Sequence, residues 1–211
     1  MKHMKQYIIL LFLGCTLSFS YGQSIDNLFK TMPDELLPAF SEANKIMLLV
    51  DSSMSVIPYP LGEIEKLDYS DTFLSLKTSK VGTMQIKILP LVNNTNIVVL
   101  INTVCSKICD SNVRFFTQEW EEIDKNGLLP QLAPHIFFDK TEMDTPEFKW
   151  AVSHIEIYPL HFQFKNGSNN LEVKFDIAKH LSPQDLKRIQ PYMDSETIDL
   201  TWNKSTFVIS K

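Results

Sequence analysis

Two cysteines four residues apart, Cys105 and Cys109, constrain the fold of this 211-residue chain more than any other feature. A disulfide at this spacing has poor geometry in a helix. In a β-hairpin the two Cα atoms face each other at about 5 Å, inside the range that a disulfide permits. The spacing therefore predicts a hairpin with a three-residue loop over residues 106–108, closed by the disulfide.

The register of this hairpin agrees with the hydrophobic pattern on both sides of the loop. It pairs Ile101 with Val113 and Val99 with Phe115, so apolar side chains lie opposite one another. Two other roles for the cysteines stay open. A redox pair usually has two residues between its cysteines at the start of a helix, and a metal site requires two more thiol or imidazole ligands. We expect a structural disulfide that contributes about 1–2 kcal/mol, because the ring it closes is small.

The first 22 residues indicate a compartment in which such a disulfide would form. A basic start precedes an apolar stretch over residues 7–19, and small residues end the segment at Gly22. This is the pattern of a secretory signal peptide, and it is shorter than the ~20 apolar residues of a membrane span. We expect a mature chain of residues 23–211 in the periplasm or outside the cell, where disulfides persist.

Cys15 supports a second interpretation of the leader. It follows Leu13 and Gly14 in a sequence similar to a bacterial lipobox, and lipidation there would anchor the protein to a membrane. About seven apolar residues precede this cysteine, at the lower end of the usual range, and apolar residues continue beyond it. Both features favour cleavage after Gly22 over lipidation.

Composition and charge exclude several classes of partner. The chain is 44% hydrophobic and has 6 glycines, which is typical of a packed globular protein. Its net charge is −5 and falls by two, to −7, when Lys2 and Lys5 leave with the leader. Nucleic acid is not an expected partner, because binding its backbone requires a basic face. No transmembrane segment is expected after residue 22.

Acidic residues concentrate between Glu119 and Glu147, where eight acids and two bases occur. A calcium loop would place acids at alternate positions around a glycine, and the acids before Gly127 do not follow that spacing. We interpret the segment as a solvated connector. Residues 23–211 are expected to form a single α+β domain, in which the connector could join two halves at about 23–120 and 148–211.

Hydrophobic periodicity predicts the order of helices and strands. Residues 24–32 and 41–50 have helical spacing, and Ser182 followed by Pro183 is a strong helix start. Alternation with a period of two predicts strands at residues 72–78, 83–88, 97–104, 148–151, 154–164, 171–177, 197–202 and 206–209. The expected class is α+β, with mainly antiparallel sheet, N-terminal helices and one helix in the C-terminal half.

The strand predicted at residues 154–164 contains a change of register. Apolar residues occupy odd positions up to Ile157 and even positions from Leu160 onward. A proline inside a strand also indicates a bulge or an edge. We therefore predict a β-bulge at Tyr158 and Pro159.

The histidines do not have the spacing of metal ligands. On an extended strand His154 and His161 would lie about 20 Å apart, too far to share a zinc ion. His135 and His180 have no ligand-like neighbours in the sequence. We expect no metal and no cofactor, and interpret these histidines as surface or capping residues.

Several segments resemble one known family. The motif over residues 103–111, then residues 113–116 and Trp120, is similar to secreted Bacteroidales proteins of the domain of unknown function 3256. Residues 32–38, residues 71–76 and the end of the leader fit the same resemblance, which spans most of the mature chain. The resemblance implies a cell-envelope location in a Gram-negative bacterium and no activity or site.

The sequence favours a binding role over catalysis. It contains no Gly-x-Ser-x-Gly, His-Glu-x-x-His, phosphate-loop or dinucleotide motif. We expect a non-enzymatic module that binds an envelope protein, a peptide or another ligand. The alternative is an envelope hydrolase or other enzyme whose active site has no sequence motif. Candidate partner anchors are Trp120, Trp150 and Trp202, since tryptophan is enriched at binding hot spots, although core packing is the commoner role.

The intact mass of the protein from a Bacteroidales host tests the leader and the disulfide together. We expect a chain that starts at Gln23, with two thiols that react with an alkylating agent only after reduction. A mass starting at Cys15 plus acyl chains would establish a lipoprotein. Thiols that react without reduction would rule out the disulfide.

Overall fold

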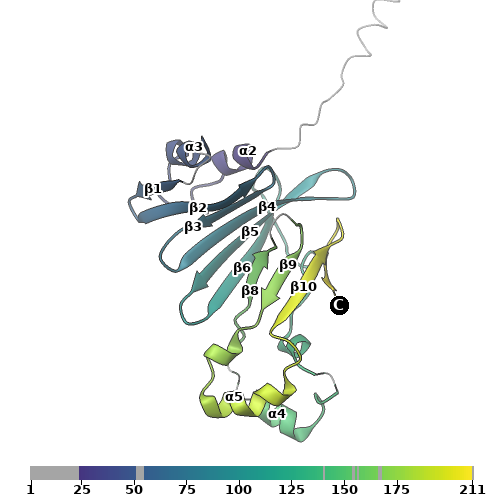
Figure 1. The fold of residues 1–211 in the computed structure, drawn as a ribbon. Coiled ribbons are helices and arrows are strands. Elements are labelled where there is room, and N and C mark those ends of the chain that lie inside the picture. The colour runs from purple at the N-terminus through teal and green to yellow at the C-terminus, as the bar shows by residue number, and fades with distance from the viewer. Residues whose placement is uncertain are drawn as a thin grey trace, which may run out of the picture.

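The computed structural model describes residues 24–50, 55–139, 141–153, 155, 157–165 and 168–210. These residues form two antiparallel sheets, one of seven strands in the order β1-β2-β3-β4-β5-β6-β7 and one of four in the order β11-β10-β9-β8. Helices α2 and α3 lie at one end of the molecule, and α4 and α5 lie at the other (Figure 1). The predicted α+β class is confirmed.

The first sheet is an up-and-down meander of consecutive strands joined by short turns. The predicted strands at residues 72–78, 83–88 and 97–104 are confirmed as β3, β4 and β5. One tight turn depends on glycine, because Gly62 has a φ of 135°, a backbone angle that residues with a side chain rarely adopt. The strands are β1 (Val56–Tyr59), β2 (Gly62–Ser70), β3 (Phe73–Lys77), β4 (Gly82–Pro90), β5 (Asn96–Cys105), β6 (Cys109–Phe116) and β7 (Glu122–Ile123).

The second sheet and the helices complete the fold. Strands β10 and β11 and helices α2, α3 and α5 agree with the predicted segments, and Ser182 Oγ accepts the N–H of Asp185 as the expected N-cap. The remaining elements are α2 (Ile25–Lys30), α3 (Glu42–Val50), α4 (Pro146–Val152), β8 (His161–Phe164), β9 (Leu171–Lys174), α5 (Pro183–Ile189), β10 (Thr197–Trp202), β11 (Phe207–Ser210) and three 3₁₀ turns, η1 (Pro134–Phe137), η2 (Ile177–Lys179) and η3 (Gln190–Tyr192).

Strand β5 separates two hydrophobic clusters because successive side chains of a strand point to opposite faces. Val98 and Leu100 pack with the residues of α2 and α3 on one face of the first sheet. Val99 and Ile101 pack on the other face with the second sheet and with α4 and α5. The protein therefore has three layers, with the first sheet in the middle (Figure 1).

Two predictions for residues 148–164 are wrong. Residues 148–151 belong to helix α4, not to a strand, because Thr145 caps the N–H of Phe148 and Pro146 occupies the first turn. The predicted strand at 154–164 is reduced to β8, which begins at His161, so the predicted bulge at Tyr158 and Pro159 does not exist. Residues 154 and 156 lie outside the described residues.

The observed register shift lies elsewhere, in β2 between Lys66 and Asp68. The strand predicted at 171–177 also ends earlier than expected, since β9 stops at Lys174 and the chain then turns into η2. Phe175 and Ile177 are nevertheless buried, so their apolar side chains enter the core from outside the sheet.

The edge of β8 attaches the second sheet to the first. Every second N–H group of residues 160–164 points away from β9 and donates to a side chain of the first sheet. Leu160 donates to Asp110 Oδ1 at 3.1 Å, Phe162 to Ser111 Oγ at 3.0 Å and Phe164 to Gln85 Oε1 at 3.0 Å. These side chains satisfy donors that an edge strand otherwise exposes.

Lys87 is a buried amine on the same face of the first sheet. Its side chain is 3% exposed, and its Nζ lies 3.1 Å from Thr72 Oγ1 and 5.9 Å from the centre of the Phe73 ring. No carboxylate of the described residues forms an ion pair with it. Burial lowers the pKa of Lys87 below its usual value of 10.5, because the charged form is poorly solvated there.

Replacing Gln85 should weaken the contact between the sheets. Gln85→Met leaves the N–H of Phe164 without its acceptor, and we expect the free energy of unfolding to fall by about 1–3 kcal/mol in urea titrations. Gln163→Met is the matched control, because Gln163 bonds only Glu172 within the second sheet. Equal effects of the two substitutions would contradict the role assigned to Gln85.

Replacing Lys87 should stabilise the protein. Lys87→Met removes the penalty of a buried charge, and we expect about 1 kcal/mol of added stability near pH 7. The unfolded chain binds more protons than the folded chain between the lowered pKa and 10.5. The wild type therefore gains stability as pH rises through that window, and the advantage of the variant shrinks. Lys77→Met at an exposed position is the control; a pH-independent advantage of Lys87→Met would contradict this account.

Candidate functional site

Strand β6 has an edge that its neighbours cover only in part. The N–H of Ser111 donates to Leu160 O at 2.9 Å, so it points away from β5. Because hydrogen-bonding direction alternates along a strand, the main-chain groups of Val113 and Phe115 point outward as well. β7 pairs with β6 only at Phe115 and Phe116.

Val113 is left between these two attachments. Its N–H and C=O face outward, and no hydrogen bond of the described residues satisfies them. The side chain of Val113 points into the cluster between the sheets and is buried. Val113 as a whole is 5% exposed, so a ligand would reach its unpaired main-chain groups only through the pocket that Val113 lines.

A pocket of about 510 Å³ lies at this edge. It receives residues from both faces of β6, because Asn112 and Val113 point to opposite sides, which is expected of a hollow at the rim of a sheet. Its other walls come from the segment after β7 and from the segment that leads into β8. The lining residues are Asp110, Ser111, Asn112, Val113, Lys125, Asn126, Leu129, Pro130, Gln131, Leu132, Ala133, Tyr158, Leu160 and Phe162.

Several polar side chains of this pocket have unused hydrogen-bonding capacity. The amides of Asn112 and Gln131, the amine of Lys125 and the hydroxyl of Tyr158 have no hydrogen-bond or ion-pair partner among the described residues. The Tyr158 ring stacks on Phe175 with centroids 6.0 Å apart. Burial raises the pKa of Tyr158, so its hydroxyl stays protonated and can donate. Apolar residues 129, 130 and 132 also line the pocket.

An ion pair holds β7 against β6 at the end of the open edge. Arg114 binds Glu122 through two hydrogen bonds of 2.8 and 2.7 Å and stacks on Phe116 at 4.8 Å. The hydrogen bonds with Glu122 raise the pKa of Arg114, and those with Arg114 lower the pKa of Glu122. A second hollow of about 340 Å³ adjoins this pair and shares Asn112, Val113 and Lys125 with the first.

The predicted disulfide hairpin lies beside the pocket. Cys105 pairs with Cys109, and the predicted register of Ile101 with Val113 and of Val99 with Phe115 is confirmed. The Cα atoms are 4.0 Å apart, closer than expected. The hairpin fixes the start of β6 and so positions Asp110 and Ser111 against the segment entering β8.

The three tryptophans occupy different environments. Trp120 is 8% exposed and donates from Nε1 to Leu28 O at 3.1 Å, which ties α2 to the end of the first sheet. Trp202 is 7% exposed and donates to Pro90 O at 2.7 Å. Trp150 on α4 is 52% exposed and lies 4.6 Å from the guanidinium of Arg188 on α5. Because Trp120 and Trp202 are buried, Trp150 is the predicted anchor that a partner can reach.

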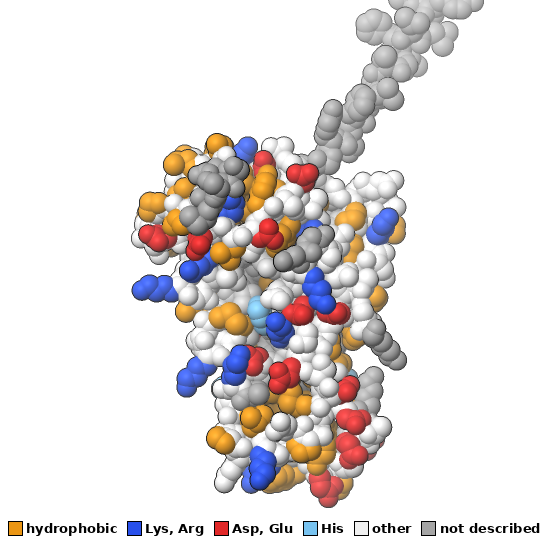
Figure 2. Space-filling view, in the orientation of Figure 1, with side chains coloured by type: hydrophobic (Ala, Val, Ile, Leu, Met, Phe, Trp, Pro, Cys, Tyr) orange, Lys and Arg blue, Asp and Glu red, His pale blue; other side chains and the backbone are white. Residues whose placement is uncertain are grey.

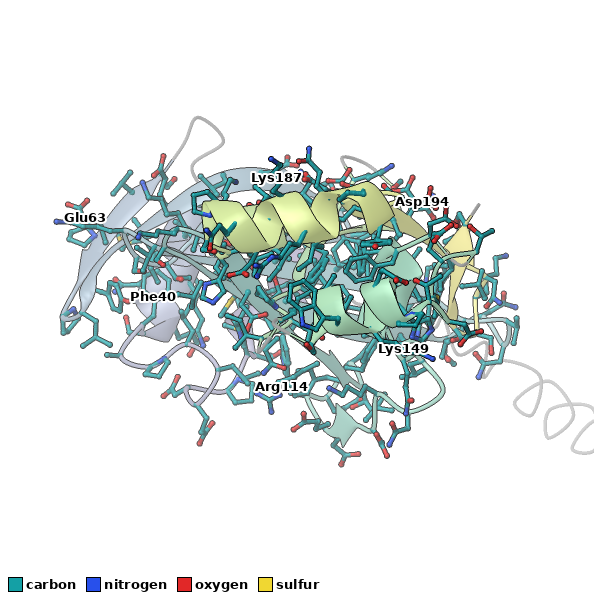
Figure 3. All side chains as sticks on the ribbon, turned by 90° about the horizontal axis from the view of Figure 1, so that it is seen from below. Phe40, Glu63, Arg114, Lys149, Lys187 and Asp194 are labelled. Carbon is teal, nitrogen blue, oxygen red and sulfur yellow. A yellow bond between two sulfur atoms is a disulfide. The ribbon has the colours of Figure 1, made fainter. Side chains whose placement is uncertain are left out.

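Helices α4 and α5 lie together at the end of the molecule opposite α2 and α3 (Figure 3). The hollow beside Trp150 has a volume of about 440 Å³ and also includes Pro146, Glu147 and Tyr192. Hydrophobic side chains also gather over α3 and β1 at the other end (Figure 2), where Met47 and Val50 are exposed.

Within the part of the chain that the structure describes, no three histidine, cysteine, aspartate or glutamate side chains converge as a metal site would require. His135 and His180 are exposed, and His154 is outside the described residues. Burial and the nearby Lys174 lower the pKa of the half-buried His161. No helix of the described residues is long and apolar enough to cross a membrane.

Sequence reasoning did not identify the pocket residues. Asn112, Lys125, Gln131 and Tyr158 belong to no motif, and Lys125 was part of the segment interpreted as an acidic connector. The available signal was the turn at Asn126 and Gly127, which begins three residues after the end of β7. The hydrophobic pattern of residues 119–133 has no periodicity that would indicate an uncovered edge on β6.

Comparisons with known proteins agree with this fold. A domain of an uncharacterized protein from Porphyromonas gingivalis W83 has a similar structure, with a TM-score of 0.79 and 19% sequence identity. The similarity covers 90% of this chain and 100% of that domain, and at this identity it shows the fold alone. No curated protein matches the sequence. The family model described as "Protein of unknown function (DUF3256)" matches residues 18–207, so the chain belongs to that family.

Proposed function

We propose that this protein is a secreted or periplasmic cell-envelope protein that binds a partner without catalysing a reaction, and that the pocket at the edge of β6 is its binding site. The observation that carries the proposal is the convergence of unused polar groups and unpaired main chain beside an apolar wall. Binding pockets are typically apolar hollows with a few placed polar groups. Cleavage after Gly22 would release the protein, and lipidation at Cys15 would instead anchor it.

The envelope location is supported by the leader and by the cysteines. Residues 1–22 have the pattern of a signal peptide, and Cys105 and Cys109 are at bonding distance in the described hairpin. The similar domain from Porphyromonas gingivalis W83 agrees with the Bacteroidales origin that the family resemblance implies.

The chemistry of the pocket favours binding over catalysis. Asp110 is the one carboxylate among its described lining residues, and it accepts the N–H of Leu160. Besides Asp110 the titratable groups of the lining are Lys125 and Tyr158, and it includes no histidine, the commonest general acid or base, and no cysteine. The groups that remain available, such as Gln131 and Tyr158, are suited to orienting a bound molecule.

Trp150 provides a second contact surface within the same proposal. Its ring and the guanidinium of Arg188 form an exposed aromatic and cationic pair at the end of the molecule. Tryptophan and arginine are the residues most enriched at interface hot spots. This surface is distant in the chain from β6 and would enlarge an interface with a protein partner.

Photocrosslinking in the native host tests the proposed site. A benzophenone amino acid at Gln131, which lines the pocket, should give one adduct of defined mass in the periplasmic or secreted fraction. The same amino acid at Val92, exposed on the turn between β4 and β5, is the control and should give none. The absence of an adduct at position 131, or the same adduct at both positions, would contradict the proposal.

A further inference from the structure

The unpaired main chain of Val113 defines the chemistry of a ligand at the pocket. In an antiparallel sheet the N–H and C=O of one residue point to the same side. At Val113 both groups face away from β5, and within the described part of the chain neither has a hydrogen-bond partner. This donor and this acceptor, which lie on the same side of one residue, match the C=O and N–H of one residue in an extended peptide.

The open part of the edge has definite limits. Leu160 occupies the position next to Ser111, and Ile123 pairs with Phe115. The distance along β6 between these two attachments is roughly 13 Å, at about 3.3 Å per residue. One outward-facing residue, Val113, lies between them. The slot therefore has room for a short extended segment and not for a long added strand.

The walls of the slot suit a peptide as well. The amides of Asn112 and Gln131 can bond peptide carbonyl and N–H groups on either side of Val113. Leu129, Pro130 and Leu132 form an apolar wall that can hold an aliphatic or aromatic side chain. The two adjoining hollows share Val113, so a chain can cross the slot from one to the other.

We infer that the pocket binds an extended peptide segment of another protein, which pairs with the main chain of Val113 and places an apolar side chain against residues 129–132. This inference rests on the proposed function and specifies its ligand. Main-chain pairing supplies affinity with little dependence on sequence, and the apolar wall supplies selectivity.

The test uses the disulfide-bonded chain 23–211 and a phage-displayed library of random linear heptapeptides as the probe. Val113→Pro removes the outward N–H without removing a ladder bond to β5, and proline is tolerated at strand edges. We expect affinity for the selected peptides to fall about tenfold in Val113→Pro. Val113→Ala, which keeps the N–H while removing the two γ-methyl groups from the core, should stay within about twofold of the wild type.

Amide hydrogen exchange gives a readout that does not depend on a variant. The Val113 amide should exchange quickly in the isolated protein and at least about tenfold more slowly with a selected peptide bound. The amides of Asn112 and Arg114, which face β5, should be protected in both states. N-methylation of the peptide residue that pairs with Val113 should weaken binding by at least about tenfold, because it removes the donor to the Val113 C=O.

The outcomes separate this inference from the proposed function. Selected peptides that bind Val113→Pro as tightly as the wild type, or that leave the Val113 amide unprotected, would overturn peptide pairing at β6. A library that yields no binder at this site would overturn it too. A crosslinked adduct at position 131 would still support the pocket as a binding site in each case.

Discussion

The attachment of β8 to the face of the first sheet is the contact on which the rest of the structure depends. Asp110, Ser111 and Gln85 accept three main-chain N–H groups of an edge that would otherwise be exposed. A polar edge could not be buried against a sheet without such acceptors, because each unpaired donor costs about 1–3 kcal/mol. With the edge satisfied, the apolar faces of the two sheets can close over a common core.

The same contact creates the candidate site. The segment that enters β8 crosses the edge of β6 at Ser111, and β7 covers that edge again only from Phe115. The interval between them leaves the main chain of Val113 unpaired. The contact that completes the packing of the two sheets therefore also leaves the main chain of Val113 unpaired. The disulfide at the end of the hairpin holds β6 in place next to this position.

Local patterns predicted the elements that local interactions stabilise. Helix α5 was predicted because Ser182 and Pro183 form a complete start signal within four residues. Helix α4 was missed although Thr145 and Pro146 form a similar signal, because the short apolar run that follows also fits a strand. The bulge predicted at Tyr158 is absent because residues 157–160 form no strand, and the N–H of Leu160 instead bonds the side chain of Asp110.

The sequence by itself determined the disulfide hairpin, its register and the alternating burial of residues 82–86 in β4, because a four-residue cysteine spacing and a two-residue period are local geometric constraints. Only the tertiary structure decided how the sheets meet and where a ligand could bind. Phe164 and its acceptor Gln85 are 79 residues apart, and nothing in either segment specifies the other. The outward groups of Val113 are main-chain atoms, which every residue carries, so their availability depends on which neighbours the fold places beside them.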